Sequence, residues 1–267
     1  MERKSPAFDP HTPNIARLYD YLLGGKDHFP ADRAAAAKML EVAPELRAAI
    51  RANRAFLGRA VRFLAKSGIT QFLDVGTGLP AQPTVHELAR EIAPAARVVY
   101  VDRDPVVLVH ARALLAGQGG TTVAGGDLRD PGAILADPSV AAALDLGRPV
   151  GVLLTAVLHH LGDADRPEEV VASLRDALAP GSCLVLSHGT SDARADAVHT
   201  ITEVYESTDA PITLRSRERI AGLFEGFELA DPGLVWLPEW RPEEADALDF
   251  PDGPESSLIL CGVGRKG

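Results

Sequence analysis

Short apolar runs alternate with helical patterns between about residue 70 and residue 190, and this alternation constrains the fold more than any other feature of the chain. The runs are rich in Val, Leu and other apolar residues, and they lie at 71–75, 97–101, 121–124, 150–155 and 183–187. Strands of this kind are buried on both faces, as in a parallel sheet covered by helices. Because parallel crossovers are almost always right-handed, the pattern predicts an α/β protein with a doubly wound sheet.

The C-terminal part of the chain follows a different pattern. Residues 227–229, 234–237 and 257–263 are strand-like, but a polar stretch with several prolines, and no helical pattern, separates the last two. Consecutive strands without a crossover helix pair in an antiparallel way. We therefore predict a sheet of seven strands that ends in an antiparallel hairpin.

The first part of the chain has the pattern of three helices. The first ends at Gly24, the second begins at Pro30, and the third runs from Pro44 to Gly68. Proline favours the first turn of a helix and glycine favours its end, so these residues set the expected boundaries. We expect a helical section over residues 13–68, in front of the sheet.

Composition and charge exclude several classes of protein. The chain carries 37 Asp and Glu against 27 Lys and Arg, and the net charge of -10 disfavours a nucleic-acid partner. No run approaches the ~18 apolar residues of a membrane span, and the first residues lack the apolar segment of a secretion signal. We therefore expect a cytoplasmic protein with no membrane partner. No metal site is legible, because the two cysteines lack metal-ligand spacing.

Three acidic residues follow three successive predicted strands. Asp74 lies two positions before Gly76, Asp102 ends the second run, and Asp127 follows the third. The carboxyl ends of parallel strands meet on one side of the sheet, where ligands bind in folds of this type. Glycines such as Gly76 and Gly78 permit a tight turn and a close approach of the ligand to the backbone. The glycines alone also fit a dinucleotide turn.

The positions of the acids favour a ligand that carries a cation and an unphosphorylated ribose. Asp74 would repel a pyrophosphate and attract an ammonium or sulfonium group. Asp102 is placed to accept hydrogen bonds from both ribose hydroxyls of NAD or of S-adenosylmethionine. Asp127 is placed to accept a hydrogen bond from an adenine amino group, with Leu128 packed on the ring. Capping of the turn before Pro131 is the alternative role of Asp127.

Over about residues 70–263, the chain resembles the class I S-adenosylmethionine-dependent methyltransferases. The similarity includes Asp74-x-Gly76-x-Gly78, Asp102, Asp127 and the terminal hairpin. Three further segments resemble an actinomycete S-adenosyl methyltransferase family long catalogued as a domain of unknown function. These segments are LLGGKDHF at 22–29, RANRAFL at 51–57 and GTGLP at 76–80.

The resemblance implies a Rossmann-like fold, S-adenosyl-L-methionine as cofactor and a bacterial source. It implies a disordered or extended segment at 1–12, a helical lid at 13–68 and a cofactor-binding methyltransferase domain at 69–267. It also implies that Cys183 lies on the fifth strand and Cys261 on the seventh, which are antiparallel neighbours in this fold. We therefore expect the two cysteines to lie near each other as buried thiols.

The resemblance further implies a set of cofactor contacts. Gly76 and Gly78 approach the methionine part, Asp102 holds the ribose, and Asp127 with Leu128 receives the adenine. Further contacts from the main domain are Thr77, Arg103 and Thr155. The lid residues Tyr21, Gly25 and Arg54 complete the set, with a role for Tyr21 inside the lid core left open.

A sulfonium methyl group is already electrophilic, so the protein mainly has to align an acceptor with it. A hydroxyl acceptor also needs a general base, and His159 and His160 follow the fourth apolar run at the expected place. Each of them has a purely structural role as its alternative. His188 and His86 are weaker candidates. We expect O- or N-methylation of a small molecule, such as a secondary metabolite.

Two other functions stay open at this point. A regulatory protein that binds S-adenosylmethionine or S-adenosylhomocysteine without turnover needs the same cofactor residues. An NAD-dependent oxidoreductase is less favoured, because Asp74 and the terminal hairpin argue against it. The sequence does not predict the acceptor or the oligomeric state, although a homodimer is possible.

Overall fold

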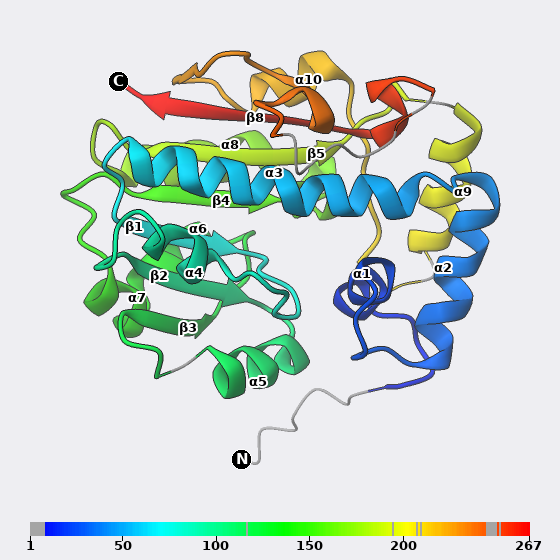
Figure 1. Cartoon of the computed structure of the whole chain (residues 1–267), viewed down its shortest axis with the longest axis horizontal. Coiled ribbons are helices and arrows are strands. Elements are labelled where there is room, and N and C mark those ends of the chain that lie inside the picture. The colour runs from blue at the N-terminus through cyan, green and yellow to red at the C-terminus, as the bar shows by residue number, and fades with distance from the viewer. Residues whose placement is uncertain are drawn as a thin grey trace.

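The apolar runs form one sheet of eight strands in the order β3-β2-β1-β4-β5-β8-β6, with β7 paired to β8. Figure 1 shows the sheet in a computed structural model of the chain, which describes residues 9–115, 117–193, 195–206, 208, 210–243, 250 and 252–267. The strands are β1 (Gln71–Val75), β2 (Arg97–Asp102), β3 (Thr121–Gly125), β4 (Gly151–Thr155), β5 (Cys183–Gly189), β6 (Phe227–Leu229), β7 (Val235–Trp236) and β8 (Ile259–Lys266).

The first five strands are parallel, and the strand order reverses between β1 and β4. β8 runs antiparallel to β5, β6 and β7, so the doubly wound sheet with an antiparallel C-terminal part is confirmed. The described residues contain eight strands where a sheet of seven was predicted, because the strand-like segments 227–229 and 234–237 both pair with β8. The carboxyl ends of the parallel strands meet beside the reversal, where sheets of this topology bind ligands.

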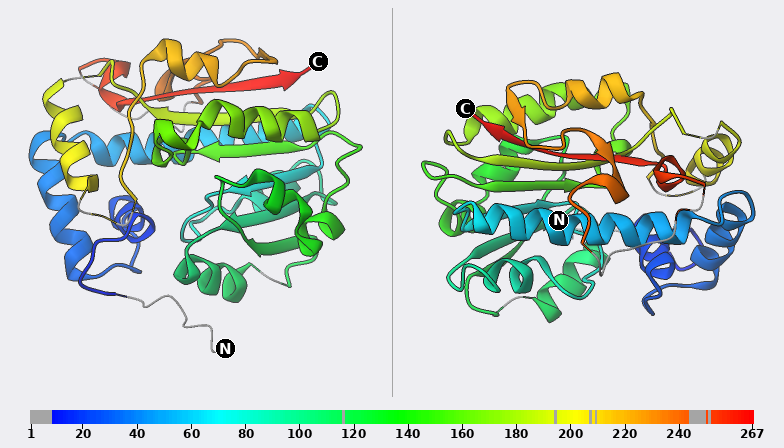
Figure 2. Two further views of the ribbon diagram at one scale, coloured as in Figure 1. Left: turned by 180° about the vertical axis from the view of Figure 1, so that it is seen from behind. Right: turned by 45° about the horizontal axis from the view of Figure 1, so that its top comes forward.

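Helices cover both faces of the sheet, as Figure 2 shows. On one face, an apolar core joins the sheet to α3 (Leu46–Lys66), α4 (Val85–Arg90) and α5 (Pro105–Leu114). On the other face, the core includes α6 (Pro131–Ala136), α7 (Pro138–Ala143), α8 (Pro167–Ala177) and α10 (Arg217–Gly222). Short 3₁₀ turns lie at Leu158–His160, Asp163–Asp165, Leu237–Glu239 and Pro254–Ser257. Within the described residues, no helix is both long and apolar enough to cross a membrane.

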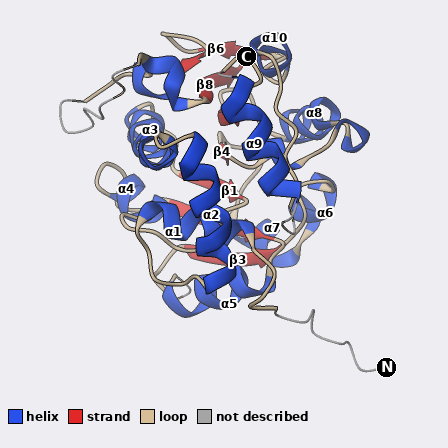
Figure 3. Cartoon of the chain, turned by 90° about the vertical axis from the view of Figure 1, so that its right-hand side faces the viewer, coloured by secondary structure: helices blue, strands red, loops and turns tan. Residues whose placement is uncertain are grey.

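A third apolar cluster lies beyond the carboxyl ends of the strands. It joins α1 (Ile15–Leu23), α2 (Pro30–Val42) and α9 (Ala195–Glu206), and Figure 3 shows these three helices together. We call α1, α2 and α9 the cap. A buried ion pair ties α1 to α2, with Arg17 Nε 2.9 Å from Asp32 Oδ2. α9 was not predicted, so the cap contains a helix from the second half of the chain as well as the expected front helices.

The long helix α3 belongs to two clusters. Its first turns contribute Leu46 and Ile50 to the cap cluster, whereas Phe56 and Leu64 pack in the sheet core. The helix therefore anchors the cap to the sheet. The division of the chain at residue 68 stays a prediction.

The start of the chain was expected to be disordered or extended up to residue 12. Residues 9–12 form a turn in which Asp9 accepts hydrogen bonds from the His11 amide at 2.8 Å and the Thr12 hydroxyl at 2.5 Å. Arg17 donates to the Thr12 carbonyl at 2.6 Å, which holds this turn against α1. Residues 1–8 lie outside the described part of the chain.

The two cysteines are buried and free, on neighbouring antiparallel strands. Their expected proximity is wrong, because the register pairs Cys183 with Arg265 and Cys261 with Ser187. Four positions along the strand separate them, or about 13 Å at ~3.3 Å per residue. The register of an antiparallel pair depends on the long connection before β8, which the sequence pattern does not specify.

Candidate active site

A cavity of about 650 Å³ lies between the carboxyl ends of the parallel strands and the cap. This volume falls within the range of roughly 300–1,000 Å³ that is typical of small-molecule sites. All but one of the predicted cofactor contacts, and both of the favoured general-base candidates, line the cavity: Gly25, Arg54, Asp74, Gly76, Thr77, Gly78, Asp102, Arg103, Asp127, Leu128, Thr155, His159 and His160. The structure therefore brings together residues that are spread over most of the chain.

Tyr21 is the exception, because it is not among the lining residues. Its ring packs edge-on against His28, with 4.9 Å between ring centroids, and the Arg47 guanidinium lies 4.8 Å from its centroid. Tyr19 lines the cavity instead. Residues two positions apart on a helix face different directions, so only one of these two tyrosines reaches the cavity.

The turn after β1 brings backbone to the cavity wall. Gly76 has φ +74 and its amide donates to the Val101 carbonyl at 2.8 Å. A Cβ at Gly76 would lie 2.3 Å from a methyl carbon of Val157, so packing alone demands glycine there. Gly78 has φ +66, and a Cβ there would meet no atom within 4 Å. The open space at Gly78 leaves room for a ligand against the backbone.

Asp74 is a buried carboxyl at the end of β1. Its Oδ2 accepts a hydrogen bond from the Thr77 hydroxyl at 2.9 Å. Burial raises the pKa of Asp74 to about 6, against the opposing effect of the Thr77 hydrogen bond and the Arg54 charge. A carboxylate in such a place is stabilised by a cation that enters the cavity, because the cation offsets the loss of water around the charge.

Asp102 is held in one orientation by backbone donors. The Gly78 amide donates to its Oδ2 at 2.9 Å, and the Asp104 amide donates to its Oδ1 at 2.9 Å. Burial raises the pKa of Asp102. Asp104 in turn accepts a hydrogen bond from Asn14 Nδ2 at 2.7 Å, which links the end of β2 to the start of α1. Both oxygens of Asp102 keep lone pairs that are free to accept hydrogen bonds from a ligand.

Asp127 is more exposed than the other two acids, with 41% of its side chain accessible. Its Oδ2 lies 3.1 Å from Arg129 Nη1 and 3.8 Å from Arg103 Nη1. Leu128, the next residue, is buried and lines the cavity. Two arginines thus fix the carboxylate of Asp127 at the mouth of the cavity, and its contact with adenine stays a prediction.

Two residues from the first part of the chain, Arg54 and Gly25, also line the cavity. Arg54 Nη2 donates to the Ala81 carbonyl at 2.6 Å and to the Pro83 carbonyl, and these bonds brace the loop that follows Gly78. At Gly25, a Cβ would lie 1.9 Å from a carboxylate oxygen of Asp20, so a larger residue would require that carboxylate to move. Asp20 itself lines the cavity and was not singled out in the sequence.

His159 and His160 lie in the turn after β4, and their hydrogen bonds assign their tautomers. His159 Nδ1 accepts a hydrogen bond from the Gly189 amide at 3.2 Å, so its proton is on Nε2. His160 Nδ1 lies 3.2 Å from the Ala210 carbonyl, which only accepts, so its proton is on Nδ1 and the lone pair is on Nε2. Burial lowers the pKa of His159 and lowers that of His160 to about 4. Both rings are therefore neutral near neutral pH.

His188 is occupied on both sides of its ring. Its Nδ1 donates to the Gly189 carbonyl at 2.7 Å, and its Nε2 accepts from Arg215 Nη1 at 3.1 Å. Burial lowers the pKa of His188 to about 4, and the Arg215 charge acts in the same direction. His188 is absent from the cavity wall, and so is His86, which contacts the Tyr100 hydroxyl at 2.9 Å through Nδ1.

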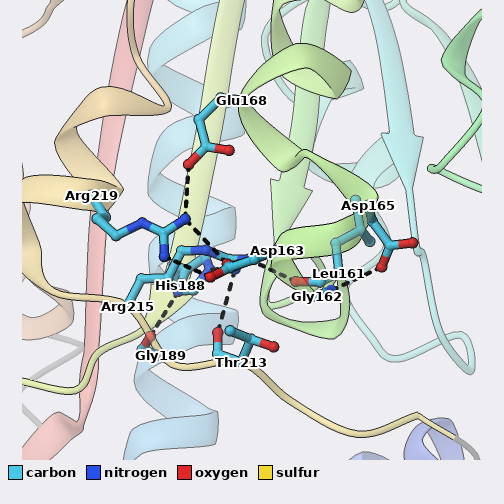
Figure 4. Close-up of polar contacts among 10 residues, drawn as sticks. All are labelled: Leu161, Gly162, Asp163, Asp165, Glu168, His188, Gly189, Thr213, Arg215 and Arg219. Atoms are coloured by element: carbon cyan, nitrogen blue, oxygen red, sulfur yellow. Dashed lines mark hydrogen bonds and ion pairs between the residues drawn. The ribbon is translucent and has the colours of Figure 1, made fainter.

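Figure 4 shows the buried Arg215 beside His188 and its other polar contacts. Arg215 Nη2 donates to the Leu161 carbonyl at 2.8 Å and lies 3.0 Å from Asp163 Oδ1. Asp163 also pairs with Arg219 at 2.9 Å. The Nε of Arg215 is buried and has no hydrogen-bond partner in the described part of the chain. No periodic pattern or motif pointed to Arg215, because it follows a loop.

Several cavity residues were not predicted as site residues, although Asn53 lies within the RANRAFL segment at 51–57. Tyr19, Asn53 and Tyr205 come from α1, α3 and α9, and all three line the cavity. Asn53 Nδ2 donates to the Tyr19 hydroxyl at 2.8 Å. In the described ranges, no group of His, Cys, Asp and Glu side chains has the arrangement of a metal site.

Solved structures with this fold and with high sequence identity exist. The chain matches a candidate methyltransferase from Thermobifida fusca YX at 43% identity and a TM-score of 0.89, over 96% of each chain. It matches a DUF574 family protein from Streptomyces avermitilis at 40% identity and a TM-score of 0.92, over 97% of this chain and 99% of that one. Mitomycin 7-O-methyltransferase shares the fold at 20% identity and a TM-score of 0.50, over 79% of this chain and 54% of that one. No curated protein matches the chain.

The family match agrees with the resemblance seen in the strand-end acids and the first helices. It extends over residues 1–267 and carries the description S-adenosyl methyltransferase. The sequence-based prediction of the family and of the cofactor is thereby confirmed. The chain belongs to the S-adenosyl methyltransferase family and is a methyltransferase that uses S-adenosyl-L-methionine.

Proposed function

We propose that this methyltransferase acts on a small-molecule acceptor, by O- or N-methylation, inside the cavity between the strand ends and the cap. One observation carries the proposal: the buried Asp74 and the half-buried Asp102 share one cavity of about 650 Å³ with the neutral His160. The cavity lies beneath α1 and α9, which suits a ligand that is enclosed better than a polymer that passes across the surface.

The residues of the cavity fit S-adenosylmethionine. Asp102 presents two oriented oxygens for the ribose hydroxyls, and Asp74 provides a buried carboxylate for the ammonium group. Gly76 and Gly78 leave backbone near the methionine part. We assign the adenine to the space beside Asp127 and Leu128. The remaining proposed contacts are Gly25, Arg54, Thr77, Arg103 and Thr155, all of which line the cavity.

When bound, the cofactor supplies a methyl group that its sulfonium makes electrophilic. The chain has to hold an acceptor in line with that group and exclude water, and such positioning can contribute about 7–11 kcal/mol to lowering a barrier. His160 has its lone pair on Nε2, because Nδ1 is committed to the Ala210 carbonyl. We assign to His160 the acceptance of a proton from the acceptor atom, and to His159 a supporting donor role through Nε2.

Thermal unfolding with S-adenosylmethionine, S-adenosylhomocysteine or NAD tests the cofactor residues. At 100 times its dissociation constant a ligand adds about 2.7 kcal/mol to the free energy of unfolding, and each kcal/mol shifts the midpoint by roughly 2–4 °C at this chain length. We expect a shift with both sulfur ligands and none with NAD. Asp102→Asn should lose most of the shift, whereas Glu228→Gln, an exposed acid on β6, should keep it.

Transfer itself is tested by offering S-adenosylmethionine with extracts of small metabolites and measuring S-adenosylhomocysteine. Formation of S-adenosylhomocysteine that depends on the extract, and that persists after all polymers are removed by filtration, supports the small-molecule acceptor. Activity that is found only with the retained polymer fraction contradicts it. A thermal shift with NAD alone contradicts the assignment of the cofactor residues.

A further inference from the structure

The two ends of the cavity differ in charge. The end formed by the loops after β1, β2 and β3 carries charged side chains, including Asp74, Asp102 and Arg103. The other end is formed by α9, the segment 210–214 and the residues before β8. Its described lining side chains carry no charge: Val198, Ile201, Tyr205, Ile212, Leu214 and Leu258. The cofactor residues account for the first end, and the second end is the space that remains for an acceptor.

His160 lies at the edge of this uncharged end. Its backbone carbonyl accepts a hydrogen bond from Arg129 Nη2 at 3.3 Å, whereas its Nδ1 bonds to the Ala210 carbonyl and its ring centroid lies 5.8 Å from that of Tyr205. Tyr205 and Tyr19 pack in the same apolar cluster of the cap, and both line the cavity. His160, Tyr205 and Tyr19 thus bring polar atoms to a largely apolar part of the wall.

A chain of hydrogen bonds from Ser187 through Asn53 determines whether the Tyr19 hydroxyl can donate a hydrogen bond to a ligand. The Ala156 amide donates to Ser187 Oγ at 2.9 Å, so the Ser187 hydroxyl donates to Asn53 Oδ1 at 2.6 Å. Asn53 Nδ2 then donates to the Tyr19 hydroxyl oxygen at 2.8 Å. The Tyr19 proton is left to point away from Asn53, and Tyr19 lines the cavity. This part of the wall therefore offers a donor at the Tyr19 hydroxyl and an acceptor at the Nε2 lone pair of His160.

A hydroxyl group matches this donor and acceptor better than an amine. During methylation a hydroxyl oxygen keeps one lone pair for a hydrogen bond from Tyr19, uses the other as nucleophile, and gives its proton to His160. A neutral amine has a single lone pair, which the methyl group requires, so it leaves the Tyr19 donor without an acceptor. A carboxylate gains no unpaired cation here, because Arg103 and Arg129, whose charges act on His160, are both paired with Asp127, and burial of an unpaired charge is costly.

From these contacts we propose that the acceptor is an uncharged, largely apolar molecule that presents a hydroxyl group between Tyr19 and His160. This inference rests on the proposed function, because it assumes that the cofactor occupies the charged end. In the transfer, the acceptor oxygen forms a bond to the methyl carbon as the carbon–sulfur bond breaks. The electron pair of that bond stays on sulfur, which becomes a neutral thioether, and the hydroxyl proton passes to Nε2 of His160.

Binding of three probes of equal size tests the proposal. The probes are 2-naphthol, 2-naphthylamine and 2-naphthoate, titrated by fluorescence into protein saturated with S-adenosylhomocysteine. We expect 2-naphthol to bind at least about tenfold more tightly than 2-naphthoate, because the uncharged end does not compensate the carboxylate. Tyr19→Phe should weaken the binding of 2-naphthol by about two- to tenfold and should change the affinity for 2-naphthylamine by less than about twofold. Tyr21→Phe, whose side chain lies outside the cavity, is the matched control and should change neither.

Three results would overturn the proposal. They are equal or tighter binding of 2-naphthoate, an equal response of the naphthol and the amine to Tyr19→Phe, and no binding of 2-naphthol at concentrations up to about 1 mM. Binding of S-adenosylhomocysteine is measured first on the same samples. Its absence would reject the proposed function itself, whereas its presence with any of the three results would reject only the acceptor class.

Discussion

The two ends of the cavity are built in different ways. At the cofactor end, the polar groups directly follow strands, and neighbouring loops orient them, as when the Gly78 amide holds Asp102 at 2.9 Å. At the proposed acceptor end, the wall comes from α9, the segment 210–214 and the residues before β8, and Tyr19 of α1 adds a hydroxyl. These segments are far apart in the sequence, and apolar packing in the cap cluster brings them together. In the proposed division, the sheet end binds the cofactor and the cap end binds the acceptor.

The largest expected effect comes from the buried support of the acceptor end. Arg215→Ala leaves the Leu161 carbonyl and His188 Nε2 without their donor, in a region where the Arg215 side chain is fully buried. Each neutral buried acceptor that is left unsatisfied costs about 1–3 kcal/mol in the free energy of unfolding. Arg219→Ala removes a half-exposed arginine from the same carboxylate and should cost at most about 1 kcal/mol. Urea unfolding of both variants checks this difference, and equal losses would contradict it.

The next effect separates the two ends directly. Asp102→Asn replaces the charged acceptor of the ribose hydrogen bonds by a neutral amide. The affinity for S-adenosylhomocysteine should fall by about 10- to 100-fold, which corresponds to a loss of about 1.5–3 kcal/mol. Ile201→Ala, at the acceptor end, should leave this affinity within about twofold. Calorimetric titration measures both. A comparable loss in the two variants would mean that the ends do not act separately.

The pH dependence of cofactor binding sharpens the role of Asp74. Its carboxyl has a pKa of about 6 in the free protein, so it is protonated at lower pH. Binding of an ammonium group to the carboxylate then first requires the loss of that proton. The affinity for S-adenosylmethionine should therefore be constant above pH 6 and fall by about tenfold per pH unit below it. Asp74→Asn should bind more weakly above pH 6 and show no slope. A wild-type affinity that is flat from pH 7 to pH 5 would contradict this role.

The same carboxyl affects the stability of the free protein in the opposite sense to a salt-bridged acid. Its native pKa lies above the unfolded value, so the native state binds more protons between these two values. The free energy of unfolding contributed by Asp74 is therefore full below the unfolded pKa and decreases as the pH rises toward about 6. Urea unfolding at several pH values, compared with Asp74→Asn, measures this contribution.

The smallest effect is expected from Tyr21. Its ring lies between His28 and Arg47 and outside the cavity, so Tyr21→Phe should leave cofactor affinity within about twofold. Titration with S-adenosylhomocysteine checks it. A larger loss would place Tyr21 in the cofactor site as first predicted.

The cofactor end could be predicted because its signals are local. β1 (Gln71–Val75) and the start of α2 at Pro30 agree with the apolar run and the proline that predicted them. The acids at the strand ends followed from the parallel topology alone. The acceptor end has no such signal, since α9 has neither a clear start nor a motif, and the donor at Tyr19 depends on a hydrogen-bond chain from Ser187 through Asn53.

The histidines show the same limit. Their position after β4 was predictable, but the sequence could not tell which ring keeps a free lone pair. That depends on the Gly189 amide for His159 and on the Ala210 carbonyl for His160, which come from other parts of the chain. The separation of Cys183 from Cys261 was equally hidden, because it depends on strand register.

A crystal structure with S-adenosylhomocysteine bound tests the division of the cavity most directly. The account predicts ribose hydroxyls at Asp102, the amino group at Asp74, and the sulfur directed toward the uncharged end that contains His160. An adenosine group located among Ile201, Ile212 and Leu258, or a ligand that contacts neither acid, would contradict it.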